Sequence, residues 1–210
     1  MLVLHISVEW ISIQNHSADA SSLLLMEDLW LPIFVASALC LVISVLAWRV
    51  LPHHKREHLR VPTEPQLLEA LRIHMPAPGL YSFPYQGVGD ANASRADVAA
   101  NRVRGPVGYM VIGAARPTVS AWRLVQQFLF FAVVATLTAF VATLAGLKDG
   151  AAFLSVLRVA GTVATMSLVL GAVPQSIWFY RPWKSWALQF ADGLVCGVTM
   201  GVVFGWYRPR

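Results

Sequence analysis

Apolar residues gather in four long blocks, and polar residues fall mostly between them. The blocks cover residues 29–51, 121–147, 153–178 and 186–206. At about 1.5 Å per helical residue, each block is long enough to cross the roughly 30 Å hydrocarbon layer of a bilayer. The pattern predicts an all-α membrane protein with about four transmembrane helices in a bundle. An uneven leader, residues 1–28, precedes them and contains a candidate for the true start at Met26.

The segment between the first two blocks, residues 52–120, is too long for a simple turn. Residues 63–72 are typical of a short capped helix with leucines on one face. Alternating apolar positions predict two strands, over 80–83 and 107–112, that pair with each other. The Gly-, Ala- and Asn-rich stretch 87–101 predicts a mobile segment. We therefore expect a small α+β element lying against the membrane face.

Composition and charge favour a membrane protein over a soluble nucleic-acid binder. The chain is 57% hydrophobic and 13% charged, whereas a soluble domain carries about a quarter charged residues. Its net charge of +5 comes from 16 Lys and Arg residues, of which ten lie between Arg49 and Arg123. Such clustering in and beside one loop is typical of the positive-inside rule and not of a phosphate-binding surface. We therefore expect the lipid bilayer, and no nucleic acid, as a partner.

The same rule predicts the orientation of the chain. Loop 52–120 holds eight of the 16 Lys and Arg residues and loop 179–185 adds Arg181 and Lys184, whereas residues 1–28 contain no Lys or Arg. Both loops are therefore expected in the cytoplasm, with the N-terminus and the C-terminus outside. The two arginines at the C-terminal end weigh weakly against this orientation.

The last block carries a regular series of glycines. Gly193, Gly197, Gly201 and Gly205 are four residues apart, so they form one gently winding groove on a helix. Such a groove lets a neighbouring backbone approach closely. Gly161 in the third block is an expected internal partner, and a dimerisation or partner-docking seam is the alternative.

Apart from Arg49 and Arg123 near block ends, two charged residues stand inside the apolar blocks. Asp192 is the only acidic one, about two turns into its helix. An intramembrane carboxylate is a functional-site hypothesis by default, although a structural salt bridge or hydrogen-bonded anchor is the favoured interpretation. Arg158 lies about 1.5 turns into its helix, on the exterior side in the orientation predicted above, and snorkelling to the headgroups explains it. The candidate partners for Asp192 are Arg181, Lys184, Arg123 and Gln126.

No catalytic residues are predicted, because no known catalytic or cofactor-binding motif occurs in the chain. We therefore expect no cofactor. His54 and His58 are four residues apart and are weak candidates for a metal site if their segment is helical. The simpler interpretation is a juxtamembrane cluster that faces anionic lipid headgroups. Cys40 and Cys196 are expected to be small buried apolar residues.

A series of motifs in the chain resembles a family of uncharacterised bacterial inner-membrane proteins. The motifs are Leu-Trp-Leu-Pro (29–32), Leu-Pro-His-His-Lys (51–55), Pro-Gly-Leu-Tyr-Ser-Phe-Pro (78–84), Gly-Pro-Val-Gly (105–108), Arg-Val-Ala-Gly-Thr (158–162), Ser-Ile-Trp-Phe-Tyr-Arg-Pro-Trp (176–183), Asp-Gly-Leu (192–194) and Phe-Gly-Trp (204–206). The resemblance implies a bacterial origin and a shared fold, without a biochemical activity. It also implies that Arg158, Arg181 and Asp192 recur in the family.

Three functions remain open at this point. The first is a structural, assembly or accessory subunit of a membrane complex, with a protein partner or a second copy bound through the transmembrane helices. The second is a small oligomeric channel or transporter lined by Asp192 and Arg158. The third, with the least support, is a membrane enzyme acting on lipid through Asp192 and the histidines of residues 53–58.

Overall fold

The structure is a computed structural model that describes residues 29–55, 57–75, 77–85, 94–114, 120–147 and 150–207. The predictions for the leader, including a start at Met26, lie outside these residues, as do the C-terminal arginines. The described chain forms two compact units. One comprises the residues up to His54, those between Ser120 and Gly171, and those from Ala187 onward. The other comprises the loop between the first two long helices and residues 172–186.

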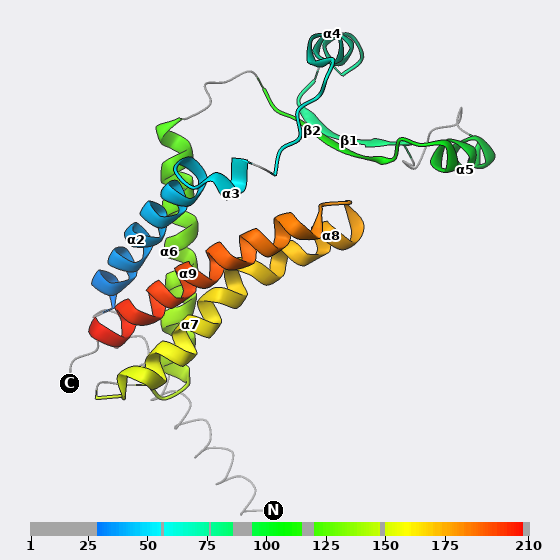
Figure 1. The fold of residues 1–210 in the computed structure, drawn as a ribbon. Coiled ribbons are helices and arrows are strands. Elements are labelled where there is room, and N and C mark those ends of the chain that lie inside the picture. The colour runs from blue at the N-terminus through cyan, green and yellow to red at the C-terminus, as the bar shows by residue number, and fades with distance from the viewer. Residues whose placement is uncertain are drawn as a thin grey trace, which may run out of the picture. The chain divides into compact units, whose positions relative to one another are not determined.

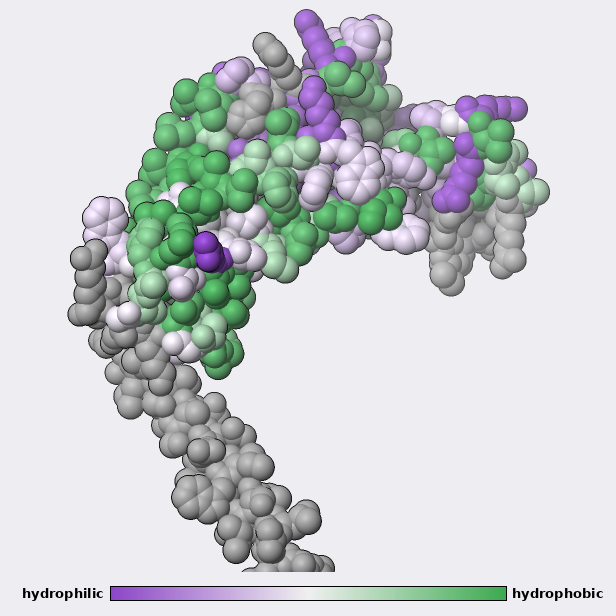
Figure 2. Space-filling view, turned by 60° about the horizontal axis from the view of Figure 1, so that its bottom comes forward, coloured by the Kyte–Doolittle hydropathy of each residue, from purple (hydrophilic) through white to green (hydrophobic). Residues whose placement is uncertain are grey.

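Four described helices are long and apolar enough to cross a membrane. They are α2 (Trp30–Arg49), α6 (Ala121–Leu144), the continuous helix of α7 (Phe153–Val169), η1 (Leu170–Ala172) and α8 (Val173–Trp178), and α9 (Trp183–Tyr207) (Figure 1). Only 28% to 39% of their most apolar stretches is buried inside the chain. Broad areas of the surface are correspondingly hydrophobic (Figure 2). The predicted all-α membrane fold is confirmed: this is a membrane protein.

Local sequence explains where the helices begin. The side chain of Ser120 accepts a hydrogen bond from the Trp122 amide, which caps α6. The carbonyl of Pro182 accepts hydrogen bonds from the amides of Ser185 and Trp186. Helix α9 therefore begins directly after this proline, three residues earlier than its hydropathy pattern indicates, because proline lacks only the N–H and keeps its carbonyl.

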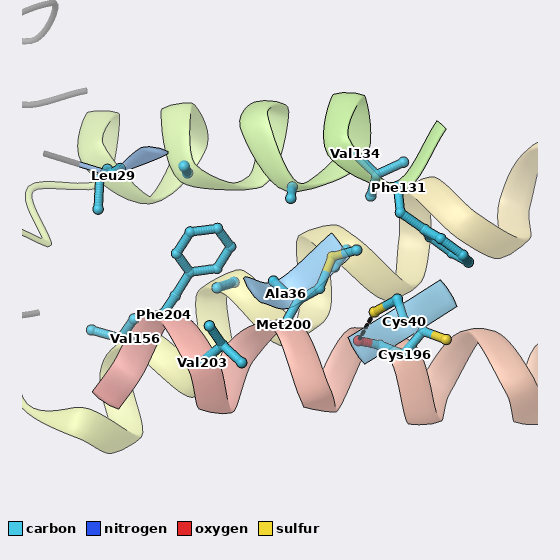
Figure 3. Close-up of a cluster of buried hydrophobic side chains, with 14 residues drawn as sticks. Leu29, Ala36, Cys40, Phe131, Val134, Val156, Cys196, Met200, Val203 and Phe204 are labelled. Atoms are coloured by element: carbon cyan, nitrogen blue, oxygen red, sulfur yellow. Dashed lines mark hydrogen bonds between the residues drawn. The ribbon is translucent and has the colours of Figure 1, made fainter. Parts of the chain in front are cut away.

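Small side chains dominate the core of the helical unit. A cluster of buried residues draws on α2, α6, α7 and α9 and includes several alanines that bring the helices close together (Figure 3). Met200 and Phe204 are its largest fully buried side chains. Cys40 donates a weak hydrogen bond from Sγ to the carbonyl oxygen of Cys196, at 3.5 Å. Both cysteines are buried, as predicted.

The second unit contains the small sheet. β1 (Gly79–Phe83) pairs antiparallel with β2 (Gly108–Ile112), as predicted, and α4 (Glu64–His74) precedes them. The prediction of a mobile stretch up to residue 101 was wrong from residue 95, where α5 (Arg95–Arg104) begins. The Ser94 side chain accepts hydrogen bonds from two amides at the start of this helix. This cap stabilises the helix although the Gly-, Ala- and Asn-rich composition of the stretch disfavours regular structure.

Candidate functional site

The end of helix α2 and the short turn that follows it position His54, the first residue of the site. Helix α2 ends at Arg49, because Pro52 cannot donate the next backbone hydrogen bond and disfavours helical geometry in the residue before it. The chain restarts at once as a single turn, α3 (Pro52–Lys55). This turn lays the ring of His54 flat on the indole of Trp48, with ring centroids 4.1 Å apart and planes inclined by 1°. His54 is consequently buried, with 3% of its surface exposed.

Asp192 meets this histidine from α9. The distance between His54 Nε2 and Asp192 Oδ2 is 2.6 Å. An ionised carboxylate only accepts hydrogen bonds, so Nε2 is the donor when Asp192 is ionised. The contact joins residues that are 138 positions apart. A hydrogen bond to a charged group contributes about 1.5–3 kcal/mol to stability, so this pair fixes α3 against α9.

The pair lies in the wall of a pocket of about 240 Å³. Asp192 is one-quarter exposed, so its carboxylate is accessible, whereas His54 is buried and contacts that carboxylate through Nε2. Polar side chains contribute to the lining, and the remainder is apolar. The lining consists of Ser44, Trp48, His54, Gln127, Gln189 and Asp192 together with Ile43, Phe130, Phe131, Leu168, Gly193 and Cys196. A pocket of this composition binds a group with a polar or cationic end and an apolar body.

The glycine series of α9 lies against α7. A Cβ atom added to Gly197 would lie 2.9 Å from both the carbonyl oxygen of Gly161 and the amide nitrogen of Thr165. One added to Gly201 would lie 2.9 Å from the carbonyl oxygen of Leu157. Real Cβ atoms do not approach backbone so closely, so these glycines allow the two helices to touch.

At the two ends of the series only side chains stand in the way. A Cβ atom at Gly193 would overlap Cγ2 of Val169, and one at Gly205 would lie 2.7 Å from the ring of Phe153. The exposed ring of Phe153 can turn aside where backbone cannot, whereas Val169 is buried and β-branched and has no such freedom. The series is therefore least tight at Gly205.

Neither Arg158 nor Arg181 is among the residues that line this pocket. Arg158 is exposed and lines a groove of about 300 Å³ between α7 and α9, beside Gly161 and Thr165. Arg181 donates hydrogen bonds to the side-chain oxygen of Gln175 and the carbonyl oxygen of Ser185, both at 3.5 Å. Asp192 and Arg158 thus line two different cavities, and one partner of Asp192 is His54.

Comparisons with known proteins leave this site without a precedent. No family model matches the chain, and neither a curated protein nor a solved structure matches it significantly. Its chemistry has to be argued from its own residues.

The two candidate metal ligands have different surroundings. His54 is held between Trp48 and Asp192, whereas His58 is exposed. Among the described residues, no three His, Cys, Asp or Glu side chains come together as a metal site would require. The His54 ring is instead a hydrogen-bond donor to a carboxylate.

Sequence reasoning singled out Asp192 and His54 separately and missed that they meet. It also missed Trp48, Gln127 and Gln189 as parts of one lining. A usable signal was present: His54 follows the end of one span and Asp192 stands early in another, on the side where both loops are expected. The search for a cationic partner directed attention to Arg and Lys and away from histidine.

Proposed function

We propose that the protein is an accessory or assembly subunit of a membrane complex, and that it engages its partner at the His54–Asp192 pocket. One observation carries the proposal: a partly exposed carboxylate, supported by a buried histidine, lies in a mostly apolar pocket of about 240 Å³. A carboxylate in the first half of α9, accessible from this pocket, attracts a cationic or hydrogen-bond-donating group. A lysine or arginine side chain of a neighbouring membrane protein meets both requirements of the pocket, since its stem is apolar and its head is charged.

We place the protein in a bacterial inner membrane, with loops 52–120 and 179–185 in the cytoplasm and both termini outside. The resemblance noted above supports the location, and the distribution of cations supports the orientation. The His54–Asp192 contact brings the end of α2 to the first half of α9, as expected if both loops lie on one side. Fusions of alkaline phosphatase and green fluorescent protein after Tyr207 check the orientation: phosphatase activity without fluorescence is expected, and the reverse contradicts it.

Photocrosslinking in native membranes tests the docking role. A diazirine-bearing aliphatic residue replaces Ile43, which lines the pocket, or its neighbour Val42, which is 54% exposed and outside the lining. We expect a discrete protein adduct from position 43 and none from position 42. The adduct should disappear with Asp192→Asn and persist with the control Arg158→Gln, which removes a charge from the other cavity.

Two outcomes reject this role. In the first, the folded protein gives no adduct from the pocket position. In the second, the adduct forms equally well after Asp192→Asn. Retention of the variants in the membrane fraction and a single symmetrical peak in size-exclusion chromatography establish that they are folded.

A small oligomeric channel or transporter is the second candidate, and the polar lining favours it. Gln127, Gln189 and Ser44 join Asp192 around the pocket, and such side chains can replace part of the hydration shell of a cation. Arg158 has no part in this version, because it lines another groove. Cation flux into liposomes that contain the purified protein, abolished by Asp192→Asn, would favour transport over docking; no flux in the unmodified protein would eliminate it.

A further inference from the structure

An exposed apolar pair lies on one face of the two-stranded sheet. Leu80 of β1 stands directly opposite Val111 of β2. Their side chains are 63% and 76% exposed, although both are among the most apolar residue types. Directly opposed side chains of an antiparallel pair lie on the same face, so the two form one continuous apolar surface.

The same face carries Tyr109. Successive side chains of a strand alternate between faces, so Tyr109 and Val111 point to the same side. The Tyr109 ring packs against Phe179, with centroids 4.9 Å apart, and against Tyr180, with centroids 6.1 Å apart. All three aromatic residues belong to the second compact unit. The exposed face with Leu80, Tyr109 and Val111 is therefore the face that contacts the connector between α8 and α9 (residues 179–182).

That connector lies at the level of the lipid headgroups. The helix that ends at Trp178 has 26 residues and α9 has 25, so they are about 39 and 37 Å long at about 1.5 Å per residue. The hydrocarbon layer is about 30 Å thick and the whole bilayer about 40–45 Å. Both helices thus end within the headgroup layers. Exposed Trp178 and Trp183 flank the connector, as interfacial aromatic residues do.

We propose that the Leu80–Tyr109–Val111 face is a membrane-docking surface, buried in the headgroup and upper acyl region of the leaflet where α8 ends. The Tyr109 contacts hold β2 beside residues at headgroup depth, and the apolar pair continues this surface toward the lipid. Exposed Lys184, one residue into α9, adds positive charge that favours an anionic bilayer. The occupant is the lipid of the protein's own membrane, independently of the function of the pocket.

Depth-dependent fluorescence quenching tests the proposal. Single cysteines replace Leu80, Val111 or the control Gly79, and each is labelled with nitrobenzoxadiazole in nanodiscs of phosphatidylethanolamine and phosphatidylglycerol. Gly79 is the matched control: it is the next residue along β1, on the opposite face, and a Cβ there makes only an ordinary 3.7 Å contact with Tyr81. Native Cys40 and Cys196 are buried, and unmodified protein labelled in parallel corrects for them.

The expected result separates the two faces of the sheet. Labels at positions 80 and 111 should emit at shorter wavelength and be quenched by spin-labelled lipids, at a depth of about 5–10 Å below the headgroup surface. The label at position 79 should report water. Two positions on the same face guard against misfolding of one variant, and size-exclusion profiles identify any variant that fails to fold.

Other results overturn the proposal. Labels at 80 and 111 that report water in the folded protein would place the face in the aqueous phase. Equal quenching at 79, 80 and 111 would mean that no face is selected. Labels that are exposed in nanodiscs but protected in native membranes would assign the surface to a protein partner in place of lipid.

Discussion

Helix α9 presents two surfaces of opposite character, beginning at adjacent residues. From Gly193 onward, a series of glycines lies against α7 with no space for an added atom at its centre. From Asp192, a carboxylate reaches His54 in the wall of a pocket of about 240 Å³. One surface excludes everything except a neighbouring backbone, and the other leaves room for a further group.

The difference shows how a small membrane protein combines rigidity with accessibility. In lipid there is little hydrophobic drive between helices, so close backbone contact supplies much of the association. A packed interface of this kind has one geometry and is suited to holding α7 and α9 together. A hydrogen-bonded pair in a partly open pocket can instead exchange partners, which is why function is proposed there.

The largest expected effect follows from filling the tight surface at its centre. Gly197→Val forces α9 away from the Gly161 carbonyl and the Thr165 amide. Overpacking of this kind should lower the free energy of unfolding by about 3 kcal/mol. Denaturation by increasing fractions of sodium dodecyl sulfate in mixed micelles, followed by circular dichroism, measures the loss.

The matched control for this variant is Gly171→Ala, whose added Cβ meets no atom within 4 Å. Its unfolding free energy should be unchanged or rise by up to about 1 kcal/mol, because alanine is favoured over glycine inside a helix. Equal losses in both variants would mean that the glycines matter for a reason other than the close approach of α7.

The next largest effect concerns the pair at the pocket. His54→Phe keeps an aromatic ring on Trp48 but removes the hydrogen bond to Asp192, and Asp192→Asn removes the charge at nearly constant size. A double-mutant cycle of these two variants should yield a coupling energy of about 2 kcal/mol, as expected for a hydrogen bond to a charged group. The same detergent titration measures it.

The corresponding control cycle combines Asp192→Asn with Arg158→Gln. These residues line separate cavities, so their effects should add. A coupling energy near zero for His54 and Asp192 would mean that their contact does not stabilise the protein, and the pair would no longer support a role for the pocket.

The fold was predictable because its determinants are local. Four apolar blocks of membrane-crossing length specify the spans, and alternation over 80–83 and 107–112 specifies the two strands. The missed helix α5 depends on one hydrogen-bonding side chain, Ser94, in a stretch whose overall composition disfavours structure. A cap is a single-residue signal, and averaging over the stretch hides it.

The candidate site was predictable only in part, for the opposite reason. Asp192 and the glycines stand out because they are unusual residues in apolar surroundings. Their contacts depend on elements far apart in the chain: Pro52 turns the chain back so that His54 reaches α9. No local pattern encodes a meeting between residues separated by 138 positions.

A smaller effect tests how far the aromatic stack contributes to the site. Trp48→Leu leaves an apolar side chain of good helix propensity but removes the ring under His54. Aromatic pairs add about 0.5–1.5 kcal/mol beyond the area they bury, so a loss of about 1 kcal/mol is expected. Trp30→Leu, at the other end of α2, is the comparison, and an equal loss there would indicate interfacial anchoring in place of the stack.

The smallest effect separates the centre of the glycine series from its end. In Gly205→Ala the new Cβ approaches mainly the ring of Phe153, which is 46% exposed at the first position of α7 and can turn aside. Replacing glycine by alanine within a helix gains about 0.8–1.0 kcal/mol, which offsets the strain, so the net change should be within about 0.5 kcal/mol. At Gly197 the obstacle is backbone, and the same gain cannot compensate. If Gly205→Ala destabilised the protein as much as Gly197→Ala in the same titration, the series would be uniformly tight, and the greater tightness assigned to its centre would be wrong.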